Sequence, residues 1–131
     1  MFKLFKRTPL YIKVYKNKIE ITNLLNRETV SKNAIEKFST ERIIVSKFQP
    51  ALKLISEILV EMKLYRRYLP YSFNILVQQM TKFDDDFSDI EKRAYRDLCE
   101  QVGANEVHLI SNHEKLTIEQ ATIEIKRKDN Y

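Results

Sequence analysis

The amino-acid sequence predicts a single α/β domain in which helices pack on a mixed β-sheet. Three observations carry this prediction: alternating strand-like segments open the chain, two amphipathic helical segments follow, and a short apolar strand comes after each of them. The length of 131 residues lies within the roughly 100–200 residues of one domain, and 44% hydrophobic content suffices for a core. We expect residues 1–9 to form a basic amphipathic segment and residues 10–131 to form the domain.

The first strands are predicted by the alternation of apolar and polar side chains. Residues 10–16 (LYIKVYK) and 18–25 (KIEITNLL) alternate in this way on either side of a short turn, which predicts an antiparallel hairpin. Residues 27–34 predict a weaker third strand, and residues 42–46 (RIIVS) predict a further short extended piece.

The next segment has the spacing of a helix with one buried face. Pro50 stands at its expected first position, where the missing N–H removes no helical hydrogen bond. Apolar side chains then recur at three-and-four spacing: Ala51, Leu54, Ile55, Ile58, Leu59, Met62 and Tyr65. Residues 73–80 (FNILVQQM) form a nearly continuous apolar run, which predicts a strand covered on both faces.

A second helix is predicted between Ser88 and Gly103. Ser88 and Glu91, three residues apart, form an expected capping box, and Gly103 stands where a left-handed residue ends a helix. The buried stripe of this helix consists of Ile90, Ala94, Tyr95, Leu98, Cys99 and Val102. Residues 106–110 (EVHLI) predict a short strand after it.

The C-terminal residues 115–127 fit two structures. Thr117 and Gln120 offer another capping box and so indicate a helix, whereas Ala121, Ile123 and Ile125 alternate as they would in a strand. Both interpretations remain open at this point, and we favour the helix.

Composition excludes several classes of function. Phosphate-binding loops need several glycines, and this chain has one, so it contains neither a Walker loop nor a dinucleotide fingerprint. No apolar run approaches the ~20 residues of a membrane span and no signal peptide is evident, so we expect a cytoplasmic protein. The net charge of +5 is interleaved with eighteen acidic residues and does not by itself select a partner. We expect Cys99 to be a small buried hydrophobe rather than a reactive thiol.

Residues 89–110 (DIEKRAYRDLCEQVGANEVHLI) resemble the bacterial actin MreB, the rod-shape-determining family of actin-like ATPases. The matching residues are Arg93, Ala94, Gly103, Ala104, Glu106, Val107, Leu109 and Ile110. Residues 41–62 are similar to the strand and helix that precede this segment in the family. The resemblance implies a ribonuclease-H-like fold, a mixed sheet with an antiparallel N-terminal hairpin and helices packed on it, and it corresponds to the first subdomain only.

The chain departs from this family where nucleotide would bind. The family has an Asp-x-Gly-Thr phosphate loop inside its first hairpin, whereas this chain reads YIKVYKNKIEI there, and residues 111–113 (SNH) replace the Glu-Glu-Pro of the family. Because the chain has the length of one domain, we also expect the second half of the nucleotide cleft to be absent. We therefore expect a degenerate nucleotide site, with no bound nucleotide, cofactor or metal and no enzymatic activity.

These observations favour a non-catalytic, MreB-like interaction module, linked to cell shape or to an envelope-associated cytoskeleton. Its expected partners are another protein or a second copy of the chain, and a peripheral contact with anionic membrane at its inner face. The membrane contact would use residues 2–7, which combine apolar and cationic side chains: Phe2, Lys3, Leu4, Phe5, Lys6 and Arg7. A disordered start is the other interpretation of this segment.

Two alternative functions rest on other segments. A nucleic-acid-binding module would use the basic and aromatic stretch at residues 65–71, whose contact residues would be Tyr65, Arg66, Arg67, Tyr68 and Tyr71. The same stretch also fits a plain helix end.

The second alternative is a metal-dependent hydrolase that uses Asp84, Asp85 and Asp86. A solvated loop stabilised by the following helix dipole explains these aspartates better. His108 is expected to be a buried core histidine, and His113 lies in the following loop, so the two histidines predict no metal site.

Overall fold

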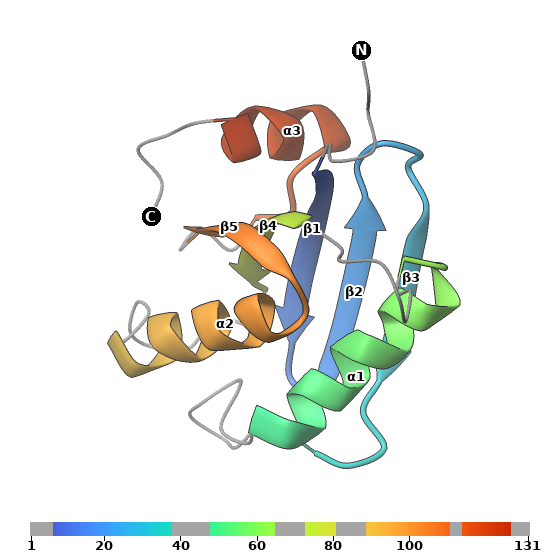
Figure 1. Cartoon of the computed structure of the whole chain (residues 1–131), viewed down its shortest axis with the longest axis vertical. Helices are drawn as coiled ribbons and strands as arrows, with labels where there is room; N and C mark the ends of the chain where they lie inside the picture. The colour runs from blue at the N-terminus through green and yellow to red at the C-terminus, as the bar shows by residue number, and fades with distance from the viewer. Residues whose placement is uncertain (1–6, 38–47, 65–72, 81–88, 111–113, 127–131) are drawn as a thin grey trace.

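The computed structural model describes residues 7–37, 48–64, 73–80, 89–110 and 114–126. Within them the chain forms five strands and three helices around one sheet (Figure 1). In chain order these are β1 (Thr8–Tyr15), β2 (Lys18–Asn23), β3 (Thr29–Asn33), α1 (Phe48–Glu61), β4 (Phe73–Gln79), α2 (Asp89–Gln101), β5 (Ala104–Ile110) and α3 (Ile118–Lys126). The predicted α/β class and mixed sheet are therefore confirmed.

The sheet has the strand order β3-β2-β1-β4-β5. β2 runs antiparallel to both β1 and β3, whereas β4 runs parallel to both β1 and β5. The parallel pairs are those whose strands are joined through helices, as expected for crossover connections. The predicted hairpin is confirmed, and its turn places Asn17 in the left-handed region (φ 55°), which asparagine tolerates better than most residues.

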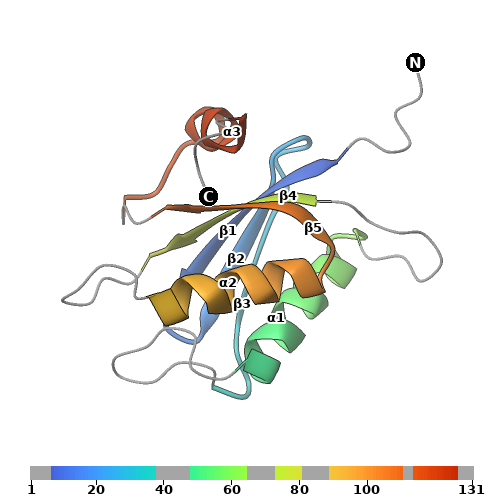
Figure 2. The ribbon, with the colours of Figure 1, turned by 60° about the vertical axis from the view of Figure 1, so that its left-hand side comes forward.

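Helices cover both faces of the sheet. Figure 2 shows α1 and α2 on one face and α3 on the other. Because side chains alternate along a strand, β1 sends Leu10, Ile12 and Val14 into the large core under α1 and α2, and Tyr11 into a smaller cluster under α3. β4 is likewise buried on both faces, as its apolar run predicted.

The smaller cluster combines side chains from three strands or turns with two from the helix: Tyr11, Leu24, Leu76, Ala121 and Ile125. α3 thus has a much narrower apolar contact with the sheet than α1 and α2 have together. The helix interpretation of the C-terminal segment is confirmed, since Ala121 and Ile125 lie four residues apart on the buried side while Ile123 is exposed.

The start of α3 and the end of α2 are each set by the local sequence. At α3 the capping box is complete, because Thr117 N–H donates to Gln120 Oε1 (2.9 Å) and Gln120 N–H donates to Thr117 Oγ1 (3.1 Å). Gly103, with φ 105°, ends α2 as predicted, and its carbonyl accepts from Phe73 N–H (3.0 Å). The glycine therefore also joins the helix end to β4.

Several predicted boundaries differ from the structure: β2 ends at Asn23 rather than at residue 25, β3 spans Thr29–Asn33 rather than 27–34, and β5 begins at Ala104 rather than at residue 106. The starts of α1 and β1 also differ. α1 begins at Phe48, so Pro50 is its third residue; the N–H groups of a first helical turn have no partner within the helix, and the proline fits there equally well. β1 begins at Thr8 rather than near Leu10, because Thr8 and Pro9 already pair with β4. The predicted extended piece at residues 42–46 and the cap at Ser88 lie outside the described residues.

The buried stripes of α1 and α2 agree with the predicted ones wherever the structure describes them. Ala51, Leu54, Ile55, Ile58, Leu59 and Met62 are buried in α1 and just after it, and Tyr95, Leu98 and Cys99 are buried in α2. Ala94 is half-buried, and Val102 is partly buried against the core. Tyr95 also donates a hydrogen bond to Gln79 Oε1, which satisfies a polar group inside the large core.

We predict that Ile58→Ala lowers the free energy of unfolding by about 2–5 kcal/mol, because Ile58 is fully buried and its truncation leaves a cavity. Val60→Ala is the matched control, since Val60 lies on the same helix but is 57% exposed, and should change stability by about 0.5 kcal/mol or less. Urea denaturation of the two variants measures the difference. Equal losses would contradict the packing of α1 on the sheet.

Candidate functional site

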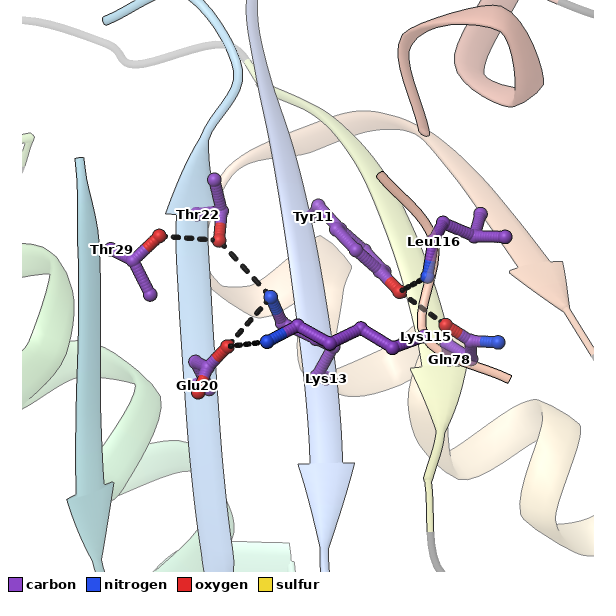
Figure 3. Close-up of polar contacts among 8 residues, drawn as sticks. All are labelled: Tyr11, Lys13, Glu20, Thr22, Thr29, Gln78, Lys115 and Leu116. Atoms are coloured by element: carbon purple, nitrogen blue, oxygen red, sulfur yellow. Dashed lines mark hydrogen bonds and ion pairs between the residues drawn. The ribbon is translucent and has the colours of Figure 1, made fainter. Parts of the chain in front are cut away.

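Polar side chains cluster on the α3-facing side of strands β1 and β2 (Figure 3). The register of the hairpin places Lys13 of β1 directly opposite Glu20 of β2, and Tyr11 opposite Thr22. Lys13 lies on a central strand, and its side chain is only 3% exposed, while that of Glu20 is 14% exposed. A nearly buried lysine is uncommon and requires partners, which the hairpin provides.

The amine of Lys13 is surrounded by groups that match its donors. Its Nζ lies 2.7 Å from Glu20 Oε2 and 3.2 Å from Thr22 Oγ1, and 4.5 Å from the centre of the Tyr11 ring. The hydroxyl of Thr22 is also hydrogen-bonded to that of Thr29 on β3 (2.8 Å). The ammonium group therefore links β1 to β2, and the Thr22–Thr29 hydrogen bond extends this network to β3.

Burial and ion pairing shift the pKa values of Lys13 and Glu20 in opposite directions. Burial lowers the pKa of Lys13, against the effect of the hydrogen bond and charge of Glu20. For Glu20, burial acts to raise the pKa, but the hydrogen bond and charge of Lys13, together with Lys115 and Lys18, outweigh it and lower the pKa. Lys115 Nζ is 3.8 Å from the Glu20 carboxylate. Glu20 is therefore ionised at neutral pH and lies among cations.

Tyr11 ties the segment before α3 to the sheet. Its hydroxyl donates to Gln78 Oε1 of β4 and accepts from the backbone N–H of Leu116 (3.1 Å). Gln78 Nε2 in turn donates to the carbonyl of Glu114 (2.7 Å). Burial raises the pKa of Tyr11, so the hydroxyl keeps its proton for this network. Two buried side chains thus hold both ends of residues 114–116, directly before α3.

Unlike the buried Lys13–Glu20 pair, the salt bridge between α3 and the β2–β3 turn is exposed to solvent. Arg27 Nη2 lies 3.2 Å from Glu119 Oε2, and both side chains are 67% exposed. Exposed pairs of this type contribute about 0–1 kcal/mol. The position of α3 therefore depends mainly on its apolar contact and on the Tyr11 network.

A second polar group lies where β1 and β5 begin. Arg7 Nη1 is 3.0 Å from Glu106 Oε2, and His108 Nε2 is 3.3 Å from Glu106 Oε1. His108 is buried, as predicted. Its Nδ1 atom and Oδ1 of Asn74 are buried with no hydrogen-bond partner among the described residues.

The chemistry available at these sites is limited by burial and pairing. The described residues contain no group of three or more histidines, cysteines and acids that could hold a metal ion. Cys99 is buried, which raises the pKa of its thiol and makes it a poor nucleophile, in line with the sequence prediction. The Lys13 amine faces Glu20, Thr22 and Tyr11 rather than solvent. The polar cluster therefore stabilises the arrangement of three strands.

Of the residues predicted to contact membrane, Arg7 is the one that the structure describes, and it is paired with Glu106. Phe2, Lys3, Leu4, Phe5 and Lys6 lie outside the described residues. The same holds for the predicted nucleic-acid contacts Tyr65, Arg66, Arg67, Tyr68 and Tyr71, and for Asp84, Asp85 and Asp86. These assignments stay predictions.

Sequence reasoning missed the Lys13–Glu20 pair, although a signal for it exists. A two-residue turn at Lys16 and Asn17 pairs Tyr15 with Lys18. Counting outward from this pair, one residue at a time on each strand, places Lys13 opposite Glu20. The burial of the pair has no such local signal, because it depends on α3 and the segment before it.

The fold and this site define the chain as a mixed α/β domain with an internally paired polar cluster on its sheet. No family model, no curated protein and no solved structure matches the sequence or the fold. Within the described part of the chain, none of the helices has the length and apolar character needed to cross a membrane.

We predict that Glu20→Gln lowers the free energy of unfolding by about 1.5–3 kcal/mol at pH 7, because the charge-assisted hydrogen bond to Lys13 is lost. The folded pKa of Glu20 lies below its ordinary value of 4.5, so its contribution is present above that value and is lost as pH falls through the folded pKa. The gap between wild type and variant should therefore narrow in acid.

Urea denaturation between pH 7 and pH 3 measures this gap. Glu119→Gln is the matched control, because it removes the same charge from an exposed pair and should shift stability by about 0–1 kcal/mol. A gap that stays constant down to pH 3 would show that the Glu20 carboxylate does not stabilise the fold through its charge.

Proposed function

We propose that this chain is a ribonuclease-H-like domain related to the first subdomain of the bacterial actins, and that it acts as a non-catalytic interaction module. The strand order β3-β2-β1-β4-β5, with the antiparallel hairpin first and helices on both faces, supports the fold assignment. The residues that carry the resemblance also form one structural unit, since they lie on α2, at its C-terminal glycine and along β5. A local resemblance within one unit is consistent with common descent.

The closed β1–β2 hairpin is the observation that carries the non-catalytic assignment. In the actin-like family this turn holds a phosphate-binding loop, whereas here Tyr15 and Lys18 pair directly across a two-residue turn. Lys18 Nζ lies 4.8 Å from the centre of the Tyr15 ring, and Lys13 is bound to Glu20 just inside the hairpin. The cations near this turn are thus partly engaged within the protein, and residues 11–21 (YIKVYKNKIEI) lack the Asp and the Gly-Thr of the family's phosphate loop.

The proposed role is to join a protein partner, or a second copy of the chain, to the inner face of an anionic membrane, as part of cell-shape or envelope assembly. The N-terminal segment would supply the membrane contact. Arg7 is bound to Glu106, so we assign this contact to residues 2–6. Each lysine in that segment would add about 1 kcal/mol near an anionic surface.

A first test concerns nucleotide. We predict that ATP with magnesium, added in large excess, leaves the melting temperature of the full-length protein unchanged, because a ligand that binds only the native state must raise it. Differential scanning fluorimetry, with ADP and magnesium alone as controls, measures the effect. A reproducible upward shift with ATP would contradict the non-catalytic assignment.

A second test concerns the membrane. We predict that the full-length protein co-sediments with vesicles containing phosphatidylserine, that added salt weakens this binding, and that deletion of residues 2–6 abolishes it. The deletion keeps Arg7 and its bond to Glu106, so the melting temperature should stay the same. Vesicles of phosphatidylcholine alone are the control for charge. Equal binding of both proteins to the anionic vesicles would remove the membrane role.

A further inference from the structure

Strand β3 forms one edge of the sheet, and two hydrogen bonds define which of its backbone groups face outward. Asn23 N–H donates to Glu28 O and Ala34 N–H donates to Asn17 O, both at 2.8 Å. In an antiparallel pair, residues bonded across the ladder recur at every second position. Even-numbered residues between Glu28 and Ala34 therefore direct their backbone N–H and C=O groups toward β2.

The odd-numbered residues of β3 direct their backbone groups away from β2. These residues are Thr29, Ser31 and Asn33. Within the described residues no strand pairs with this outer side of β3. The edge also lacks proline and bulges among the paired residues, two of the features with which proteins protect edges from pairing.

Exposed apolar side chains surround the same edge. Leu25 in the β2–β3 turn is 58% exposed, and Ile35 after the end of β3 is fully exposed. The carboxylate of Glu61 on α1 lies 3.0 Å from Lys32 Nζ on β3, so the C-terminal end of α1 lies beside the edge. Scattered apolar side chains need no explanation, but those at an open strand edge indicate an interaction surface.

We propose that β3 pairs antiparallel with β3 of a second copy of the chain, with a two-fold axis at Val30, so that two five-stranded sheets join into one. This inference rests on the proposed interaction function and identifies the partner as the chain itself. Thr29 and Ser31 of each copy would exchange their outward N–H···O=C bonds with Ser31 and Thr29 of the other.

Charge complementarity selects this register. With the axis at Val30, the two Val30 side chains face each other, and Lys32 lies opposite Glu28 of the second copy. An axis at Lys32 would instead place two lysines opposite each other, which destabilises a strand pair. An axis at Ser31 would place Lys32 opposite an apolar valine. Lys32 Nζ has three hydrogens, so it can contact both Glu61 of its own chain and Glu28 of the other.

The two-fold geometry also fixes where the helices of the two copies lie. An axis perpendicular to the sheet keeps α1 of both copies on the same face of the joined sheet, on either side of the axis.

Sedimentation velocity of the full-length protein over a range of concentrations tests the pairing. We expect a monomer–dimer equilibrium, and Ser31→Pro should weaken it roughly tenfold or more because each copy loses an outward N–H donor. Since this N–H does not bond to β2, the variant should keep its circular dichroism spectrum and most of its stability. Ser31→Ala keeps the N–H and should dimerise like wild type.

A charge-matched pair of variants tests the register. Glu28→Lys places a lysine opposite Lys32 and should weaken dimerisation roughly tenfold or more, whereas Glu36→Lys makes the same charge change beyond the paired residues and should leave it unchanged. A wild-type protein that stays monomeric up to its solubility limit, or a Ser31→Pro variant that dimerises as well as Ser31→Ala, would overturn the proposal. Vesicle binding by a monomeric protein would overturn the dimer while leaving the proposed membrane function intact.

Discussion

The central strand β1 must be buried on both faces, and the rest of the structure follows from how its alternating side chains meet that requirement. One face is apolar and packs under α1 and α2. The other face carries Lys13, whose ammonium group cannot be buried without an opposite charge. The β1–β2 hairpin places Glu20 across from it, and the bond to Thr22 connects this pair with β3 through Thr29. The hairpin register thus decides whether the strand can be buried.

A buried ion pair of this kind is a weak source of stability but a strong constraint on structure. Desolvation cancels much of its attraction, whereas loss of one partner leaves an uncompensated charge inside the protein. A hairpin shifted by one residue would place Lys13 and Glu20 on opposite faces of the sheet. We infer that the pair penalises shifted registers more than it stabilises the correct one. The hydrogen bonds of Tyr11 and Gln78 act similarly on the segment before α3, because they fit one path of the chain.

The α3-facing side of the sheet and the β3 edge differ in how many of their polar groups have hydrogen-bond partners among the described residues. Among the described residues, the face under α3 is occupied by the polar cluster and by a narrow apolar contact. The β3 edge retains outward backbone donors and acceptors, with exposed apolar side chains beside it. The two proposed contacts, through the β3 edge and through the N-terminal segment, require no catalytic centre. Pairing of two copies would also double a weak membrane contact, which raises the overall avidity.

The amino-acid sequence by itself determined the elements, because their signals are local: alternation for the hairpin, three-and-four spacing for α1 and α2, the capping box at Thr117 and Gln120, and the single glycine that ends α2. It also contained the pairing of Lys13 with Glu20, since a two-residue turn sets the register. Only the tertiary structure decided that this pair is buried, that α3 covers the face opposite α1 and α2, and that Arg7 meets Glu106 across 99 positions of sequence. These features depend on which distant segments pack together. Periodicity shows which face of a helix or strand is buried, but not which segment covers that face.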